Sequence, residues 1–132
     1  MANATRSWQP AFLPGDLPKP VGAYSPAVRA GDFVFISGQV PVDPKTQKVV
    51  SEDFETQVRQ TLSNVKAALG AAGATLDDVV SVIAYLTSMD DWGRFNDIYK
   101  ETFRAPYPTR TAVGAMLRGF KVEVSAVAYL KR

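Results

Sequence analysis

Hydrophobic residues recur at three- and four-residue steps along one long stretch of the chain. This stretch is "SEDFETQVRQTLSNVKAALGAAG", which begins at Ser51. Its apolar positions are Phe54, Val58, Leu62, Val65 and Leu69. The spacing places them on one face of an amphipathic helix, which Ser51 can cap and which Gly70 or Gly73 ends.

A second helix is predicted at about Asp91–Arg104, before the stop at Pro106 and Pro108. Ser88 with Asp91 forms a candidate capping box at its start. The side chains expected to be buried are Phe95, Ile98 or Tyr99, and Phe103. Both helices therefore need an apolar surface to cover.

Shorter runs with two-residue alternation predict the strands that supply this surface. Their approximate bounds are Ala23–Arg29, Phe33–Gly38, Val79–Thr87, Arg110–Met116 and Lys121–Leu130. The tight turn Ala30-Gly31-Asp32 predicts a hairpin of the first two. The run Val79–Thr87 is apolar on both faces, which is typical of a central strand. The last two are joined around Gly119 and could pair as a hairpin.

The resulting order β-β-α-β-α-β-β predicts an α+β fold with both helices on one face of the sheet. In the last strand Val122 and its even-numbered neighbours suit the helices. The opposite face is semi-apolar, and Phe33, Phe35, Ala112 and Met116 are expected to share it. Since no element remains to cover this face, the pattern predicts self-association.

The first twenty residues carry Pro10, Pro14, Pro18 and Pro20, a spacing that predicts an irregular N-terminal arm. Trp8 and Phe12 are candidate anchors for this arm. Residues 21–132 are expected to form a single domain.

The composition removes several classes of chemistry. The chain has no cysteine and no histidine, so thiol nucleophiles, Ser-His catalysis and the commonest metal ligands are excluded. We expect no metal and no cofactor. The net charge is only +2, which does not favour nucleic acid as a partner. Without an apolar leader or a membrane-length run, the expected location is the cytoplasm, with no membrane partner.

Two charged residues stand in the apolar strands near the C-terminus. Arg110 shares its strand face with Ala112, and Glu123 shares its face with Val127 and Tyr129. If the last two strands pair, both charges lie on the face without helices. They could bind a small anion, or they could form a structural salt bridge at an interface, and Arg110 could simply lie in solvent.

Two more stretches could form either a ligand site or plain structure. Ser37-Gly38 ends an apolar strand, where a ligand could approach the backbone closely, but it could also be an ordinary strand end. The "GAYSP" stretch could be a structural turn in which Tyr24 packs as an aromatic residue.

Six segments together resemble the RidA/YjgF family, also called the endoribonuclease L-PSP family. They are "VGAYSPAV", "FVFISGQVPVDPKTQKV", "QVRQTLSNVKAALGAAGATLDDVV", "FNDIYKETF", "PYPTRTAV" and "KVEVSAVA". They occur in the family's order and spacing. The resemblance implies a chorismate-mutase-like fold and a homotrimer whose sheets form a barrel-like core with clefts between subunits.

The resemblance also implies an activity, the hydrolysis of reactive enamines and imines to 2-oxo acids and ammonia. In the family the arginine of P-x-R, here Arg110, binds the substrate carboxylate, and the glutamate of the last strand, here Glu123, holds or activates water. Further family positions in the substrate site are Tyr24, Ser37, Gly38, Asn96 and Ala112. Ala112 stands where many members have cysteine, which argues against a thiol role.

Two other functions remain open from the sequence. The same pocket could bind a 2-oxo acid or similar carboxylate without turnover, as a regulator. A ribonuclease or translation inhibitor fits less well, because the chain lacks histidine and shows no basic stripe.

Overall fold

The computed structural model of the chain describes residues 5–11 and 17–131, which contain six strands and two α-helices. The strands are β1 Gln9–Ala11, β2 Ala27–Ala30, β3 Phe33–Gln39, β4 Val79–Leu86, β5 Thr109–Gly114 and β6 Val122–Tyr129. The helices are α1 Phe54–Ala71 and α2 Trp92–Thr102, with short 3-10 helices at Leu76–Asp78 and Met89–Asp91. None of the described helices combines the length and hydrophobicity needed to cross a bilayer.

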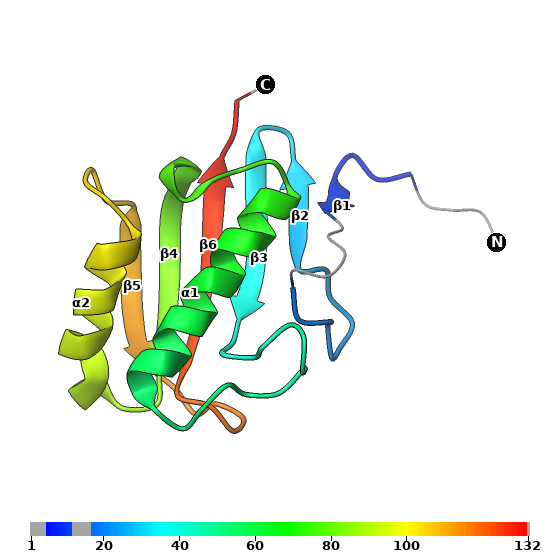
Figure 1. The fold of residues 1–132 in the computed structure, drawn as a ribbon. Helices are drawn as coiled ribbons and strands as arrows, with labels where there is room; N and C mark the ends of the chain where they lie inside the picture. Colours follow the sequence, from blue (N-terminus) through cyan, green and yellow to red (C-terminus); the bar gives the residue numbers. More distant parts are fainter. Residues whose placement is uncertain (1–4, 12–16, 132) are drawn as a thin grey trace.

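All six strands form one sheet in the order β1-β2-β3-β6-β4-β5. Only β4 and β5 pair in parallel, and the other neighbours are antiparallel. The hairpin of β2 and β3 is confirmed, with Gly31 at the turn in the left-handed region at φ 59°. Both helices lie against the same face of the sheet, as predicted (Figure 1). The fold is α+β.

The predicted hairpin of the last two strands is wrong. β4 lies between β5 and β6, because the α2 crossover returns the chain to the far edge of β4 as a parallel neighbour. The segment that follows β5 then crosses the end of β4. Ala115 N donates to Leu86 O there, and Thr87 N donates to Lys121 O. Gly119 therefore belongs to a crossing loop rather than to a hairpin turn.

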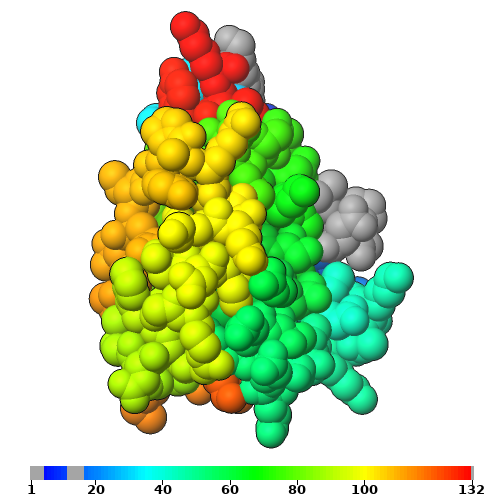
Figure 2. Space-filling view, turned by 60° about the vertical axis from the view of Figure 1, so that its left-hand side comes forward, coloured from blue at the N-terminus to red at the C-terminus, as the bar shows by residue number. Residues whose placement is uncertain are grey.

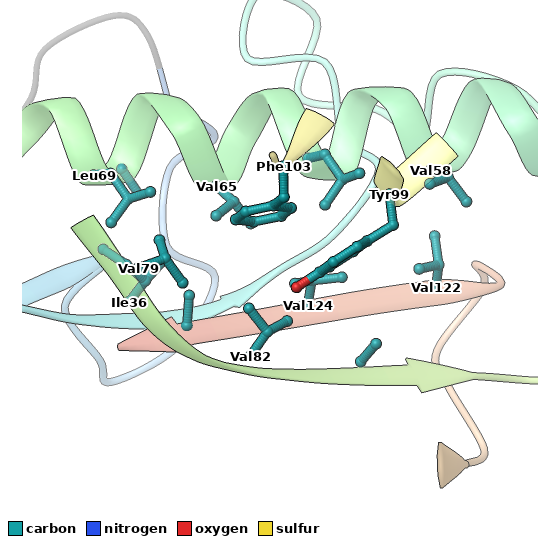
Figure 3. Close-up of a cluster of buried hydrophobic side chains, with 14 of the residues drawn as sticks. Ile36, Val58, Val65, Leu69, Val79, Val82, Tyr99, Phe103, Val122 and Val124 are labelled. Carbon is teal, nitrogen blue, oxygen red and sulfur yellow. The ribbon is translucent and has the colours of Figure 1, made fainter. Parts of the chain in front are cut away.

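The hydrophobic core lies between the two helices and the sheet. The five α1 residues predicted to face the core are 0–3% exposed, and Val122, Val124, Ala126 and Ala128 of β6 are 0–4% exposed. Tyr99 of α2 and Phe103, directly after its end, stack at 4.5 Å between their ring centres and reach toward β4 and β6 (Figure 3). This packing confirms the helix faces and the inward face of β6.

The helix ends differ from the prediction by a few residues. Asp53, not Ser51, caps α1 by accepting a hydrogen bond from Thr56 N at 2.9 Å. Ser51 instead accepts one from Asp53 N. Ser88 caps the short 3-10 helix before α2 rather than α2 itself. Asp53 lies closer than Ser51 to the free backbone N–H groups of α1, whereas Asp91 at the start of α2 makes no side-chain capping hydrogen bond.

The face of the sheet opposite the helices is open in the protomer. We call it the open face, and its large apolar members are Phe33, Phe35, Ile83, Val113 and Tyr129. Phe35 is 47% exposed, and the rings of Phe33 and Tyr129 meet edge to face at 5.4 Å. The predicted membership of Ala112 is wrong, since Ala112 pairs with buried Ala84 and packs on the core.

The prediction that the N-terminal arm is irregular is wrong at β1. Gln9, Pro10 and Ala11 pair with β2, because Pro10 sits on an edge strand where its missing N–H does not interrupt a ladder. Trp8 stays exposed at 38%, and Phe12 lies outside the described residues. The division of the chain into an N-terminal arm, residues 1–20, and a single domain, residues 21–132, stays a prediction.

Candidate active site

The predicted site residues fall into two groups on opposite faces of the sheet. Arg110 pairs with Val82 across β4 and β5, and Val82 is buried toward the helices. Glu123 pairs with Tyr85 and alternates with the buried residues of β6, so it lies on the open face. The prediction that Arg110 shares the open face with Glu123 is therefore wrong. Within one protomer the two residues form no ion pair.

Arg110 is held by an amide and three aromatic rings. Its Nη1 donates to Asn96 Oδ1 at 2.9 Å. Its guanidinium carbon lies 4.6 Å from the ring centre of Tyr99, 5.3 Å from that of Trp92 and 5.9 Å from that of Phe95. Such rings attract a cation without neutralising it. Among the described residues no carboxylate pairs with Arg110, so its charge remains available to an anion.

Tyr99 supports Arg110 as a neutral ring. Burial raises the pKa of Tyr99 to about 12, and the charge of Arg110 offsets only part of this effect. The hydroxyl is buried, has no hydrogen-bond partner in the part of the chain that the structure describes, and points at the sheet beside Val82 and Val124 (Figure 3). Tyr99 therefore stays protonated at neutral pH and cannot serve as a general base there.

A cavity of about 320 Å³ opens beside Arg110, and we call it the arginine pocket. It is lined by Asn96, Tyr99, Lys100, Tyr107, Pro108 and Arg110. In Figure 2, α2 (yellow) covers the surface between α1 (green) and β5 (orange), which explains why α2 and the segment before β5 form its walls. Asn96 thus lies in this group, and Ala112 lies behind it on the core side.

A second cavity, of about 640 Å³, contains the other predicted residues, and we call it the glutamate pocket. Its lining residues are Val21, Tyr24, Ser37, Gly38, Val40, Arg118, Phe120 and Glu123. Tyr24 is half exposed, and its hydroxyl accepts a long hydrogen bond of 3.4 Å from Val21 N. The structure therefore brings Tyr24, Ser37, Gly38 and Glu123 together, as the sequence suggested.

Hydrogen bonds to neighbouring segments hold the wall of the glutamate pocket in place. Ser37 Oγ donates to Ser25 O at 2.6 Å, which ties β3 to the segment that carries Tyr24. Asn64 of α1 is 1% exposed and donates to both Val40 O and Val42 O at 2.9 Å. These bonds fix the backbone on both sides of Gly38. The Ser37 hydroxyl is thus committed to the protein as a donor and can meet a ligand only as an acceptor.

Glu123 lies against the backbone of Gly38. A Cβ atom added at Gly38 would overlap Glu123 Oε2 and would lie 2.9 Å from its Cδ atom. Burial raises the pKa of Glu123 above its ordinary value of 4.5. A carboxylate that is short of water binds a proton more readily, which suits a group that must accept one during a reaction.

Replacement of Gly38 by alanine should displace the Glu123 carboxylate. The Glu123 side chain must swing away from the new methyl group, and a shift of about 1 Å in a reacting group can cost about 100-fold in rate. For Gly38→Ala we expect kcat/KM for an imine to fall about 10- to 100-fold, measured by release of ammonia. The matched control is Gly70→Ala, where nothing lies within 4 Å of the added Cβ. Unchanged activity of Gly38→Ala would show that the Glu123 position is unimportant.

Some lining residues escaped the sequence analysis. Lys100 lies four residues after the predicted Asn96, and Trp92, whose ring contacts Arg110, lies four residues before it, so this helical spacing could have drawn attention to both. Arg118 and Phe120 reach the glutamate pocket from the crossing loop, which the hairpin prediction had misplaced. Among the described residues no three carboxylates gather as a metal site would require.

Comparisons with known proteins agree with this architecture. The family model described as endoribonuclease L-PSP matches residues 15–130. The chain is 46% identical over 114 residues to a RutC family protein of Pyrococcus horikoshii, covering 85% of this chain and 90% of that protein. The chain therefore belongs to the endoribonuclease L-PSP family, the RidA/YjgF family that the sequence resembles.

Two further relatives carry functional names. The 2-iminobutanoate/2-iminopropanoate deaminase of Dermatophagoides farinae is 33% identical, over 86% of this chain and 91% of that protein. The crystal structure of Escherichia coli TdcF with bound serine superposes with a TM-score of 0.84 at 32% identity, covering 92% of this chain and 98% of that chain. The family thus includes proteins named as deaminases and a member that binds a small amino acid.

Proposed function

We propose that this protein hydrolyses reactive enamines and imines of the 2-aminoacrylate type to 2-oxo acids and ammonia. The observation that carries the proposal is the state of Arg110, a guanidinium held by Asn96 and aromatic rings with no carboxylate on it among the described residues. A planar guanidinium matches a substrate carboxylate with two parallel hydrogen bonds. The 33% identical relative named as an imine deaminase supports the same reaction.

The reaction needs a carboxylate anchor, a water molecule and a proton acceptor. The enamine first tautomerises to an imine, and protonation of its nitrogen makes the neighbouring carbon electrophilic. Water adds to this carbon as Glu123 accepts a proton from it, which gives a carbinolamine. Return of this proton to nitrogen and loss of the hydroxyl proton to solvent let the C–N bond break, so that ammonia leaves and the 2-oxo acid forms. No step requires a thiol, which agrees with Ala112 at the position of the frequent family cysteine.

The two halves of this machinery lie on opposite faces of the sheet in one protomer. A complete site therefore needs Arg110 from one copy and Glu123, with Gly38 and Tyr24, from another. The exposed aromatic residues of the open face supply a surface on which copies can meet. We propose that the chain forms a homotrimer in the cytoplasm, with each active site in a cleft between two subunits.

An assay of ammonia and 2-oxo acid release from imines made in the reaction vessel tests the activity. An amino acid oxidase can supply the imine, and the protein should raise the rate above that in buffer. A rate equal to buffer, with tight binding of 2-oxo acids, would favour a carboxylate-binding regulator instead. Cleavage of RNA that persists after stringent purification and depends on Arg110 or Glu123 would favour the ribonuclease.

We expect a native mass of three chains by light scattering at micromolar concentration. Phe35→Glu should shift this mass to that of one chain, because it places a charge on an apolar surface that the trimer would bury. The matched control is Val49→Glu, which changes a residue of similar exposure, 38%, in the loop between β3 and α1. A monomeric wild-type protein would contradict the trimer, and so would a Phe35→Glu trimer of undiminished stability.

A further inference from the structure

The arginine pocket holds a second cation that the proposed mechanism does not use. Lys100 lies four residues after Asn96 on α2 and lines the same cavity. No acidic side chain is among the lining residues, so the lining itself carries the two charges of Arg110 and Lys100 without a carboxylate. An excess of one charge in a concave site attracts a ligand of the opposite charge.

Unlike Lys100, three arginines in this region form ion pairs. Arg59 pairs with Glu101 at 2.8 Å, Arg104 pairs with Asp77 at 2.6 Å, and Arg94 pairs with Asp91. The carboxylate next to Lys100 in sequence, Glu101, is therefore occupied. Among the described residues Lys100 has neither an ion pair nor a side-chain hydrogen bond.

The placement of both cations on one small cavity suits a small diacid. Asn96 contacts the guanidinium of Arg110 at 2.9 Å, and Lys100 follows Asn96 by about one helical turn, or about 6 Å along the axis. The carboxylate carbons of a four- or five-carbon diacid lie about 4–5 Å apart, given C–C bonds of about 1.5 Å. The aromatic walls formed by Tyr99 and Tyr107 can pack on the carbon chain between them.

We propose that the arginine pocket binds a dicarboxylate, with Arg110 on the 2-oxo or 2-imino end and Lys100 on the distal carboxylate. The preferred substrates are then imines of dicarboxylic amino acids. The claim that the bound dicarboxylate is a substrate rests on the proposed deaminase function. The binding of a dianion depends on the pocket alone. Lys100 is a specificity-determining residue in this arrangement, and it takes no part in the proton transfers.

The test compares two stable ligands of equal chain length, 2-oxoglutarate and 2-oxopentanoate, by isothermal titration calorimetry on the full chain. Wild-type protein should bind the diacid about tenfold more tightly, the effect of one added charge-assisted contact. In Lys100→Met the ratio of the two affinities should fall to about one. Lys66→Met, which changes a lysine of α1 outside the pocket lining, is the matched control and should keep the tenfold ratio.

Equal affinities for the two acids in wild-type protein would overturn the inference, and so would a preference that survives Lys100→Met. The proposed function is tested separately by hydrolysis of a monocarboxylic imine. Hydrolysis without a diacid preference would reject the inference alone. A diacid preference without hydrolysis of any imine would reject the deaminase and leave the dicarboxylate site in place.

Discussion

Arg110→Ala is expected to abolish imine hydrolysis and 2-oxo acid binding while the fold and the assembly persist. A charge-assisted hydrogen bond contributes about 1.5–3 kcal/mol, and a two-bond contact with a carboxylate exceeds one such bond. We therefore expect affinity for 2-oxobutanoate to fall more than about 100-fold. The rate should fall further than binding, because the same contact orients the electrophilic carbon toward water. Calorimetry and the ammonia assay measure the two effects.

Arg110→Lys is the informative companion to this variant. It keeps the charge but loses the planar fork, so we expect activity nearly as low as in Arg110→Ala. The melting temperature should change little in either variant, since among the described residues of the protomer Arg110 has no carboxylate that its removal would leave uncompensated. If Arg110 instead paired with Glu123 of a neighbouring copy as a structural bridge, its removal would lower the melting temperature and the native mass sharply.

Glu123→Gln is expected to stop turnover and to spare binding of the 2-oxo acid. The amide keeps the size of the side chain but cannot accept a proton, and general base catalysis contributes about 100- to 10,000-fold. We expect kcat to fall by at least about 100-fold, while the affinity for 2-oxobutanoate changes little. A variant with near wild-type kcat would remove Glu123 from the mechanism.

The raised pKa of Glu123 gives this prediction a pH dependence. The acidic limb of kcat/KM should lie above the ordinary glutamate value of 4.5, since the carboxylate must be ionised to act. In the folded chain Glu123 keeps its proton to higher pH than in the unfolded chain, so its contribution to stability falls as pH rises through the folded pKa. Glu123→Gln removes the cost of burying an ionised carboxylate, so the variant should melt no lower than wild type at pH 7. This difference in melting temperature should vanish below pH 4.5, where the wild-type carboxyl is protonated in both states.

The sequence predicted the helices and most strands because their patterns are local. The α1 stripe, the Gly31 turn and the inward face of β6 each follow from spacing within about twenty residues. Strand order does not follow from local spacing, and the prediction that β5 and β6 form a hairpin was wrong for that reason. The run before Gly119 alternates as a hairpin would, but the parallel crossover through α2 places β5 beyond β4.

The wrong strand order also limited how much of the site could be predicted. The composition and the family motifs suggested Arg110, Glu123, Gly38 and Tyr24 as candidates, and the structure gathers the last three in one cavity. They did not reveal which face Arg110 occupies, because a strand's alternation fixes only which residues share a face. Contact with Asn96 and the α2 rings depends on packing between elements distant in sequence.

The placement of Arg110 and Glu123 on opposite faces of one sheet has a genetic consequence. In the proposed assembly each subunit lends its arginine to one site and its glutamate to another. A subunit defective in one of the two residues would silence a single site and leave its contribution to the adjacent one intact. Two alleles, each null by itself, would then complement within mixed assemblies, whereas two alleles damaged in the same residue would not.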